Sequence, residues 1–394
     1  MLSIEFNMYA TLFLAVIAVA LGSFLQKRIS FLSKFCIPAP VAGGLIISIL
    51  TCILHVFHLA EITFDETLRE FFMVFFFTSV GFQANVRVLK EGGKALIVFL
   101  ILIIVLIILQ NVTAISLSTI LGMDRLLGLC TGSIPMVGGH GTAGAFGRVL
   151  EDFNVRGATT ICTAAATFGL IAGSLLGGPL AIHLIRRYRL KPQEEKSGSA
   201  DLLKNEFSGT LDHYPEGVFY LAAAAGIGTG VSSLLSRTGL VFPVYIGAML
   251  TAALMCNLIH FTGKVQLPSA EISNFGNICL SLFLGIAMIT LKIWQLRDLA
   301  FPLLFLLSGQ VLLILLYTRL VIFNAMGRDY DAAVIAAGTC GFGMGATPNA
   351  MANMDAVTRR CGPSLKAYLL IPIVGSLFAD FINSLVITFF INFL

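Results

Sequence analysis

The sequence predicts an all-α polytopic membrane protein, built from two inverted repeats of five transmembrane helices that each carry a re-entrant hairpin. Three observations support this fold class: an apolar composition, ten long apolar segments, and glycines and prolines that recur in the second half at a nearly constant spacing. Of the 394 residues, 57% are hydrophobic and 12% are charged, and the mean hydropathy is +0.92. Soluble domains carry about 25% charged residues, so this composition indicates a chain surrounded by lipid.

Ten segments are long and apolar enough to cross a bilayer, whose hydrocarbon core takes about 20 residues of helix. The predicted spans are 8–26, 41–60, 68–82, 95–120, 156–185, 218–235, 241–261, 272–291, 301–323 and 365–392. Two further segments, near 126–147 and 331–351, are apolar but rich in glycine. We predict that both are re-entrant hairpins, which leave the membrane on the side from which they enter it.

The distribution of positive charge supports this arrangement and gives it an orientation. With the N-terminus outside, 18 of the 25 Lys and Arg residues fall on the cytoplasmic side. Cytoplasmic loops carry an excess of these residues, so the N-terminus is predicted to lie outside. A full span in place of either hairpin would invert everything after it, so the charge pattern also favours the hairpins.

A single long polar stretch divides the chain near its middle. Residues 186–216 contain runs of Lys and Glu and no apolar periodicity, which is typical of a linker. We predict a first repeat over 1–185, a cytoplasmic linker over 186–216 and a second repeat over 217–394. Because each half has five spans, an odd number, the second repeat must be inverted relative to the first.

The two halves share glycines and prolines at an offset of 203 or 204 residues, which indicates a duplication. The matched residues are Pro40 with Pro243, Gly44 with Gly247, Gly81 with Gly285, and Gly139-His-Gly141 with Gly343-Met-Gly345.

The two predicted hairpins carry the residues that are best suited to binding a solute. In each, glycines permit sharp turns, and a proline (Pro135 or Pro348) breaks the helix and removes a backbone donor. The second hairpin adds Thr347, Asn349 and Asn353. Half-helix N-termini can hold a carboxylate, and freed carbonyls can hold sodium. Close packing through small residues would explain one such motif, but two copies in equivalent positions favour binding.

Asp380 is a carboxylate deep in the last predicted span, and Asn383 lies three residues further on, on the same helix face. Acidic residues are rare inside spans and usually mark ion or substrate pathways. We expect Asp380 to bind sodium or the ammonium group of a substrate. A salt bridge to a loop arginine is the structural alternative.

Other polar residues in or near the spans have simpler interpretations. His140, in the first hairpin, can donate to a carboxylate or relay protons, although a lone histidine is more often structural. Gln110 and Asn111 follow a long apolar run and are expected to hydrogen-bond between helices. Three aspartates that flank the second hairpin are predicted to be solvated cytoplasmic charges: Asp329, Asp331 and Asp355.

Several function classes are excluded by the sequence. The basic residues are scattered among short loops, which predicts no nucleic-acid partner. No nucleotide-binding loop, zinc motif or nucleophile elbow is present, so an enzyme or a nucleotide-driven pump is not expected. Paired broken hairpins in two inverted halves are typical of secondary transporters; a channel would instead show flux without saturation.

Four stretches carry a resemblance to a known family. They are Ile37-Pro-Ala-Pro-Val-Ala-Gly-Gly44, Gly132-Ser133 with Gly138-Gly-His-Gly-Thr142, Asn277-Ile-Cys-Leu-Ser-Leu-Phe-Leu284, and Tyr330-Asp-Ala-Ala-Val334 leading to Gly341-Phe-Gly-Met-Gly-Ala-Thr-Pro348. Through them, the sequence resembles the bacterial sodium/glutamate symporter family over nearly its whole length.

The resemblance implies sodium-driven uptake of L-glutamate across the inner membrane, a homodimer, and alternating access in which a core that carries both hairpins moves against a scaffold. It assigns the hairpin role to Gly138, Gly139, His140, Gly141, Thr142, Gly341, Gly343, Gly345, Thr347 and Pro348. The predicted substrate and ion site is completed by Ser133, Asn349, Asn353, Asp380 and Asn383, with Asp380 as the candidate sodium ligand. A sodium-coupled carrier of di- and tricarboxylates and a sodium/proton exchanger stay open as alternatives.

Overall fold

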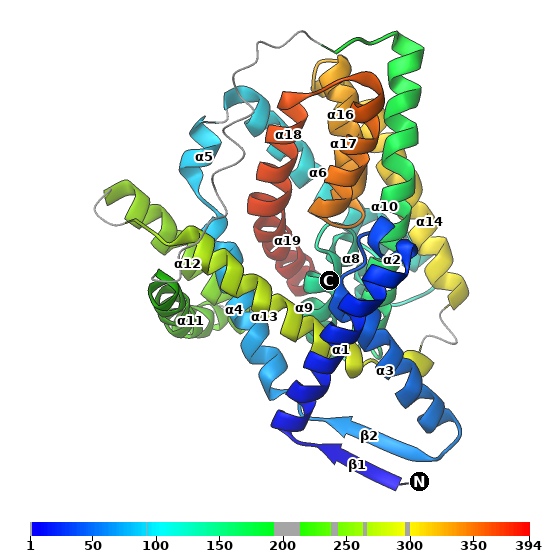
Figure 1. The fold of residues 1–394 in the computed structure, drawn as a ribbon, viewed down its shortest axis with the longest axis vertical. Coiled ribbons are helices and arrows are strands. Elements are labelled where there is room, and N and C mark those ends of the chain that lie inside the picture. The colour runs from blue at the N-terminus through cyan, green and yellow to red at the C-terminus, as the bar shows by residue number, and fades with distance from the viewer. Residues whose placement is uncertain (1, 92, 193–212, 238–242, 263–265, 296–299) are drawn as a thin grey trace.

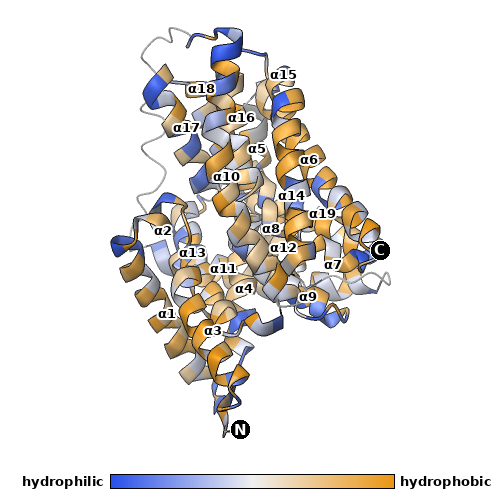
Figure 2. Cartoon of the chain, turned by 90° about the vertical axis from the view of Figure 1, so that its right-hand side faces the viewer, coloured by the Kyte–Doolittle hydropathy of each residue, from blue (hydrophilic) through white to orange (hydrophobic). Residues whose placement is uncertain are grey.

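The computed structural model describes residues 2–91, 93–192, 213–237, 243–262, 266–295 and 300–394. Within these ranges, ten helices are long and apolar enough to cross a membrane, five before and five after residues 193–212. The prediction of a multi-pass membrane protein is therefore confirmed. Hydrophobic residues cover most of the length of the helices, and hydrophilic residues gather toward the loops (Figure 2). Most of the predicted linker, 186–216, lies outside the described residues.

In the described part of the chain, ten helices and two strands precede residues 193–212, and the remaining helices follow them (Figure 1). The first set is β1 (Leu2–Phe6), α1 (Met8–Arg28), α2 (Ser30–Lys34), α3 (Ala39–Val56), β2 (Ala60–Phe64), α4 (Thr67–Gln83), α5 (Val86–Glu91), α6 (Gly93–Ile120), α7 (Arg125–Leu129), α8 (Ser133–Met136), α9 (Gly139–Asp152) and α10 (Ala158–Tyr188), followed by α11 (Tyr214–Ser236). The second set continues with α12 (Val244–Thr262), α13 (Ser269–Ile289), α14 (Ala300–Tyr317), the π-helix η4 (Thr318–Ile322), α15 (Phe323–Ala325), α16 (Tyr330–Gly343), α17 (Thr347–Cys361), α18 (Leu365–Pro372), the π-helix η5 (Ile373–Phe378) and α19 (Ala379–Phe393).

A small sheet departs from the predicted all-α class. Strand β1 pairs with β2 in parallel, with Leu2 opposite Ala60 and Phe6 opposite Phe64. The two phenylalanine rings stack with their centroids 5.5 Å apart. The predicted span 41–60 was therefore too long, because α3 ends at Val56 and Ala60 already belongs to a strand. Short strands in connections carry too few residues for a period-2 pattern to be recognised with confidence.

The helices form two groups according to the helices that they contact. We call α1, α3, α4, α11, α12 and α13 the scaffold, because α1 packs on α3, α11 on α12, and α13 on both α3 and α4. We call the others from α6 onward the core, in which α10 packs on α9, α16 and α17, and α6 packs on α14 and α19. In Figure 1, α16, α17 and α18 lie at the end of the molecule opposite to the two strands.

The molecule has two faces that lie at opposite ends of its helices (Figure 1). The linker face is the one where α10 ends and α5 lies, and the N-terminal face is the one that carries β1 and β2 (Figure 1). Helix α4 begins directly after β2 and ends before α5. It therefore runs from the N-terminal face toward the linker face.

Candidate functional site

Each predicted hairpin consists of helical segments that are interrupted near the middle of the molecule. In the first, α8 ends at Met136 and α9 begins at Gly139. In the second, α16 ends at Gly343 and α17 begins at Thr347. Helices α17 and α9, the second arms, continue past the predicted hairpin ends of 351 and 147, to Cys361 and Asp152.

The two interruptions touch one another. Gly139 has a φ of +58°, and a Cβ atom added to it would lie 2.9 Å from the carbonyl oxygen of Gly345. A left-handed backbone with no room for a side chain requires glycine at this position. This contact is consistent with the prediction from sequence that the two glycine-rich tips lie close together.

The residue-by-residue match between the tips is wrong by three or four positions. The offset of 204 equates Gly139 with Gly343, yet Gly139 begins a helix and Gly343 ends one. The ends of α8 and α16, Met136 and Gly343, are 207 residues apart. Glycine is common enough in both tips for a shifted alignment to match by composition alone.

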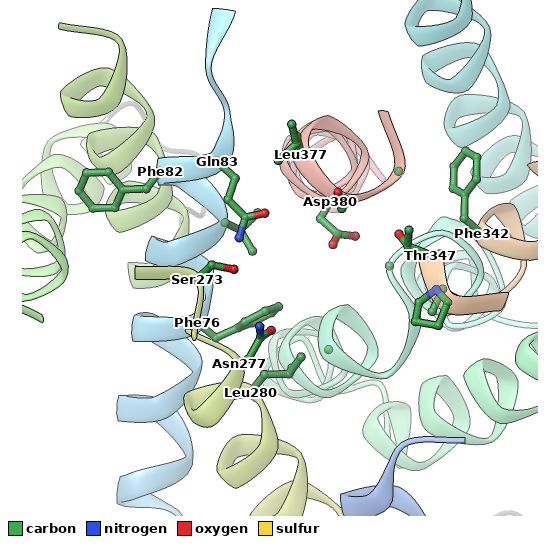
Figure 3. A pocket seen from close by; sticks show the side chains of 18 of the residues that line it. Phe76, Phe82, Gln83, Ser273, Asn277, Leu280, Phe342, Thr347, Leu377 and Asp380 are labelled. Atoms are coloured by element: carbon green, nitrogen blue, oxygen red, sulfur yellow. The ribbon is translucent and has the colours of Figure 1, made fainter. Parts of the chain in front are cut away.

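A cavity of about 720 Å³ lies where the two tips meet the scaffold. The core contributes Gly138 to Gly141 of the first tip, Gly345 to Pro348 of the second, and Asp380 of α19. Asp380 and Thr347 point into the cavity from the core side, and Gln83 of α4 and Ser273 of α13 face them (Figure 3). The wall also includes Asn85, Val88, His260 and Ser269. Because Asn85 and Val88 lie at the α4–α5 junction, the cavity extends toward the linker face.

Two helix N-termini reach this cavity without a side-chain cap. The residues that precede α9 and α17, Gly138 and Ala346, make no side-chain capping bond, and both line the cavity. The first N–H groups of a helix have no partner within the helix, and the N-terminus carries a partial positive charge. These N–H groups are therefore suited to an anionic group of a solute.

The backbone in front of Asp380 is not a regular α-helix. Residues Ile373–Phe378 form the π-helix η5, which directly follows Pro372 and precedes Asp380. Proline at 372 cannot donate a backbone hydrogen bond, and π-segments of this kind often lie at functional sites. The Asp380 carboxylate faces open space in the cavity (Figure 3), and no ion pair to it is found among the described residues.

Just over half of the predicted site residues line the cavity, and the others support its wall. The lining residues are Gly138, Gly139, His140, Gly141, Gly345, Thr347, Pro348 and Asp380. The residues that lie behind the wall are Ser133, Thr142, Gly341, Gly343, Asn349, Asn353 and Asn383.

Comparison with known proteins identifies the family. The profile of the sodium/glutamate symporter family matches residues 4–363. This chain belongs to the sodium/glutamate symporter family. A sodium/glutamate symporter of Escherichia coli strain K12 is 38% identical over 390 residues, which cover 97% of this chain and 96% of the relative. One of Haemophilus influenzae is 39% identical over 391 residues, with the same coverage. The family is one of transporters.

In this member of the family, the first predicted hairpin is held by buried amides. The Asn111 side-chain oxygen, on α6, accepts from the Ser133 amide at 2.9 Å and from its hydroxyl at 3.0 Å. The Asn383 amide nitrogen, on α19, donates to the Ser133 carbonyl at 3.1 Å. All three side chains are fully buried. Ser133 is therefore an anchor of the hairpin, and the prediction that Asn111 bonds between helices is confirmed.

The second predicted hairpin is anchored in a similar way. Asn349 donates to the Leu170 carbonyl at 2.8 Å, and Asn353 donates to the Gly173 carbonyl at 2.9 Å, both on α10. Gln110 donates from α6 to the Gly343 carbonyl at 2.7 Å. Since these amides bridge helices, the structure places them as supports for the cavity wall.

His140 lies in the cavity wall with its ring already engaged. Its Nε2 atom is 3.0 Å from the Thr167 hydroxyl, which itself donates to the Thr163 carbonyl. A hydroxyl has one proton, so His140 donates through Nε2 and its Nδ1 atom is left as an acceptor. This hydrogen bond ties the first tip to α10.

The scaffold side of the cavity was not predicted from the sequence. Gln83, Ser273 and Asn277 line it, and Figure 3 shows all three beside the open space that Asp380 faces. All three lie on α4 or α13, outside the two predicted hairpins. For Ser273 and Asn277, the signal that could have found them is their polarity inside the predicted span 272–291. Gln83 lies one residue past the predicted span 68–82.

Two of the flanking aspartates were also predicted wrongly. Asp331 is 6% exposed and accepts from the Ser364 hydroxyl at 2.6 Å. Asp355 accepts from the Tyr368 hydroxyl. Asp329 caps α16 by accepting from the Ala332 amide at 2.8 Å. Asp331 and Asp355 therefore connect α16 and α17 to the start of α18 and are not simply solvated charges, whereas Asp329 caps its own helix.

Replacing Asn111 with alanine is expected to destabilise the protein, because the buried Ser133 amide and hydroxyl would both lose their acceptor. An unpartnered buried polar group costs about 1–3 kcal/mol, so the thermal midpoint of unfolding in detergent should fall by several degrees. Asn324→Ala, at an exposed position of α15, serves as the control. An equal midpoint for both variants would contradict the anchoring role of Asn111.

Proposed function

We propose that this chain is a sodium-coupled symporter that carries glutamate into the cytoplasm across the inner membrane. Family membership supports this proposal, and the relatives in Escherichia coli and Haemophilus influenzae are named sodium/glutamate symporters. The observation that carries it is the common cavity, which both hairpin tips and Asp380 line. A site between two broken hairpins is the arrangement that secondary transporters use.

The proposed topology is two inverted repeats of five spans, with α7–α9 and α16–α17 as re-entrant hairpins. The ten candidate spans divide equally on either side of residues 193–212. Helices α9, α16 and α17 have 14, 14 and 15 residues, too few to cross a hydrocarbon core that takes about 20. Both facts support hairpins that turn back near the middle of the membrane.

We further propose an elevator-like alternating access, in which the core carries the substrate past the scaffold. The cavity lies between core and scaffold and extends toward the linker face. With the predicted orientation, that face is cytoplasmic, so this conformation is open to the inside. The homodimer implied by the family resemblance stays a prediction. In such a dimer, the scaffold would stay in place while the core moves.

The substrate's carboxylates are proposed to bind at the N-termini of α9 and α17. Glutamate carries two carboxylates and one ammonium group, whereas the described wall of the cavity contains no Lys or Arg. Uncapped N–H groups at Gly139 to Gly141 and at Thr347 are then the available donors. Gln83, Ser273 and Asn277 complete the polar surface on the scaffold side.

Sodium is proposed to bind at Asp380. Sodium prefers oxygen ligands, and the Asn383 side-chain oxygen, one turn along the same helix, is buried with no hydrogen-bond partner among the described residues. A bound cation would neutralise the carboxylate and so reduce its repulsion of an anionic substrate. This order of binding, sodium first, would couple uptake of glutamate to the sodium gradient.

The proposal predicts uptake of labelled glutamate into liposomes that contain the purified protein, only with an inward sodium gradient. Unlabelled glutamate should compete, whereas citrate and malate should not. Efficient competition by citrate or malate would favour a di- or tricarboxylate carrier. Uptake that a proton or potassium gradient drives equally well would contradict sodium coupling, and sodium-driven proton efflux without glutamate would favour an exchanger.

A further inference from the structure

A cluster of charged residues joins the scaffold to the core on the N-terminal face. The Arg69 guanidinium, on α4, lies 2.7 Å from the Glu66 carboxylate and donates to the Gly144 carbonyl of α9 at 2.9 Å. Arg148, one turn further along α9, lies 2.9 Å from the same carboxylate oxygen of Glu66. Arg69 is 6% exposed, so its guanidinium is committed to these contacts.

These contacts cross the boundary at which the two groups of helices must separate. Helix α4 belongs to the scaffold and packs on α12 and α13, whereas α9 belongs to the core and packs on α10. Beside the cluster, Phe283 of α13 leaves no room at Gly144, because a Cβ atom there would lie 2.9 Å from its ring. On this face, scaffold and core are therefore in close contact.

The opposite side of the same boundary is open. Across the cavity, Gln83 and Ser273 face the second tip without touching it (Figure 3). At the offset of 204 that relates Gly81 to Gly285, Arg69 corresponds to Ser273 and Glu66 corresponds to Ala270, and both of these line the cavity. The counterparts of the two charged residues carry no charge, so the Glu66–Arg69 ion pair has no copy at these two matched positions.

We propose that Glu66, Arg69 and Arg148 form a gate on the N-terminal face, which stabilises the conformation open to the linker face. The cavity can reach the N-terminal face only when Arg69 leaves Gly144 and Arg148 leaves Glu66. This inference rests on the proposed alternating access and adds to it a named contact that must break in each cycle. Because the counterparts are Ser273 and Ala270, this ion pair is not repeated at the matched positions of the linker face, and it therefore favours the observed state.

A buried cysteine behind the gate can test this proposal. Ala145 is fully buried on α9, next to Gly144 and on the same helix face as Arg148. In a protein whose eight native cysteines are replaced by serine, the Ala145→Cys variant in detergent should react slowly with a maleimide, at a rate set by gate opening. Adding Arg69→Ala should raise this rate on the order of tenfold, since it removes a charge-assisted hydrogen bond and an ion pair. Glu66→Gln should raise it as well, by a smaller factor.

Matched variants separate gating from loss of fold. Arg156→Ala and Glu70→Gln remove exposed charges and should leave the labelling rate of Ala145→Cys unchanged. A cysteine in place of the buried Ala224, in the scaffold, should stay unreactive with and without Arg69→Ala; a parallel rise there would mean general unfolding and would overturn the gate. The gate is also wrong if Arg69→Ala and Glu66→Gln leave the Ala145→Cys rate unchanged. That failure would leave sodium-driven uptake by the parent protein intact, whereas failure of the proposed function would abolish it.

Discussion

Replacing Asp380 with asparagine is expected to lower sodium-driven glutamate uptake by about two orders of magnitude. The carboxylate faces the cavity at the end of a π-helix, and no other acidic residue is found in the described part of the cavity wall. Removing one partner of a buried charge pair costs about 3–5 kcal/mol, whether the partner is sodium or the substrate's ammonium group. Initial rates of uptake in liposomes measure this effect.

The same variant tells the two possible partners of Asp380 apart. If Asp380 binds sodium, sodium alone should raise the thermal midpoint of the parent protein but not that of Asp380→Asn, relative to choline. If it binds only the ammonium group, the sodium effect should persist in the variant. Asp152→Asn, an exposed acidic residue at the end of α9, is the control and should transport normally. Uptake by Asp380→Asn within twofold of the parent would remove Asp380 from the site.

Replacing Gly139 with valine is expected to reduce uptake by about two orders of magnitude while the protein still folds. A left-handed backbone costs a non-glycine residue about 1–2 kcal/mol, and overpacking adds about 1–3 kcal/mol. The new side chain would meet the Gly345 carbonyl, for which only 2.9 Å is available at the Cβ position. The two tips would be pushed apart, and the cavity that they share would change shape.

A second glycine provides the matched comparison for this prediction. Gly226 lies on α11 and has nothing within 4 Å of an added Cβ atom. Gly226→Val should therefore transport at nearly the parent rate. Both variants should elute as a single symmetric peak in gel filtration. If Gly139→Val transports like Gly226→Val, the tip contact is not needed for function.

Much of the fold could be predicted from the sequence, because the bilayer leaves few choices for an apolar segment. A run such as the one in α6 must form a helix that satisfies its own backbone, and all ten predicted spans correspond to helices. The tips were located by the same logic, since Pro135 and Pro348 cannot continue an undisturbed helix. Helix ends and the strand pair were less predictable, because local propensity alone determines them weakly.

The roles of single polar residues could not be predicted, because sequence spacing does not show what a side chain faces. Asn349 and Asn353 have the polarity expected of a binding residue, yet both donate to carbonyls of α10, about 180 residues earlier in the chain. Gln83 and Ser273 belong to neither predicted hairpin and still line the cavity. Only the packing of scaffold against core distinguishes these two pairs.

The π-helix ahead of Asp380 sets the direction of its carboxylate. A segment of this type holds one residue more than an α-helical turn of the same rise, and each residue advances an α-helix by about 100°. Deleting one residue from Ile373–Phe378 would rewind the segment and swing Asp380 by roughly that angle, away from the space in front of Thr347. The number of residues in this π-helix, and not only its composition, therefore determines which way the Asp380 carboxylate points.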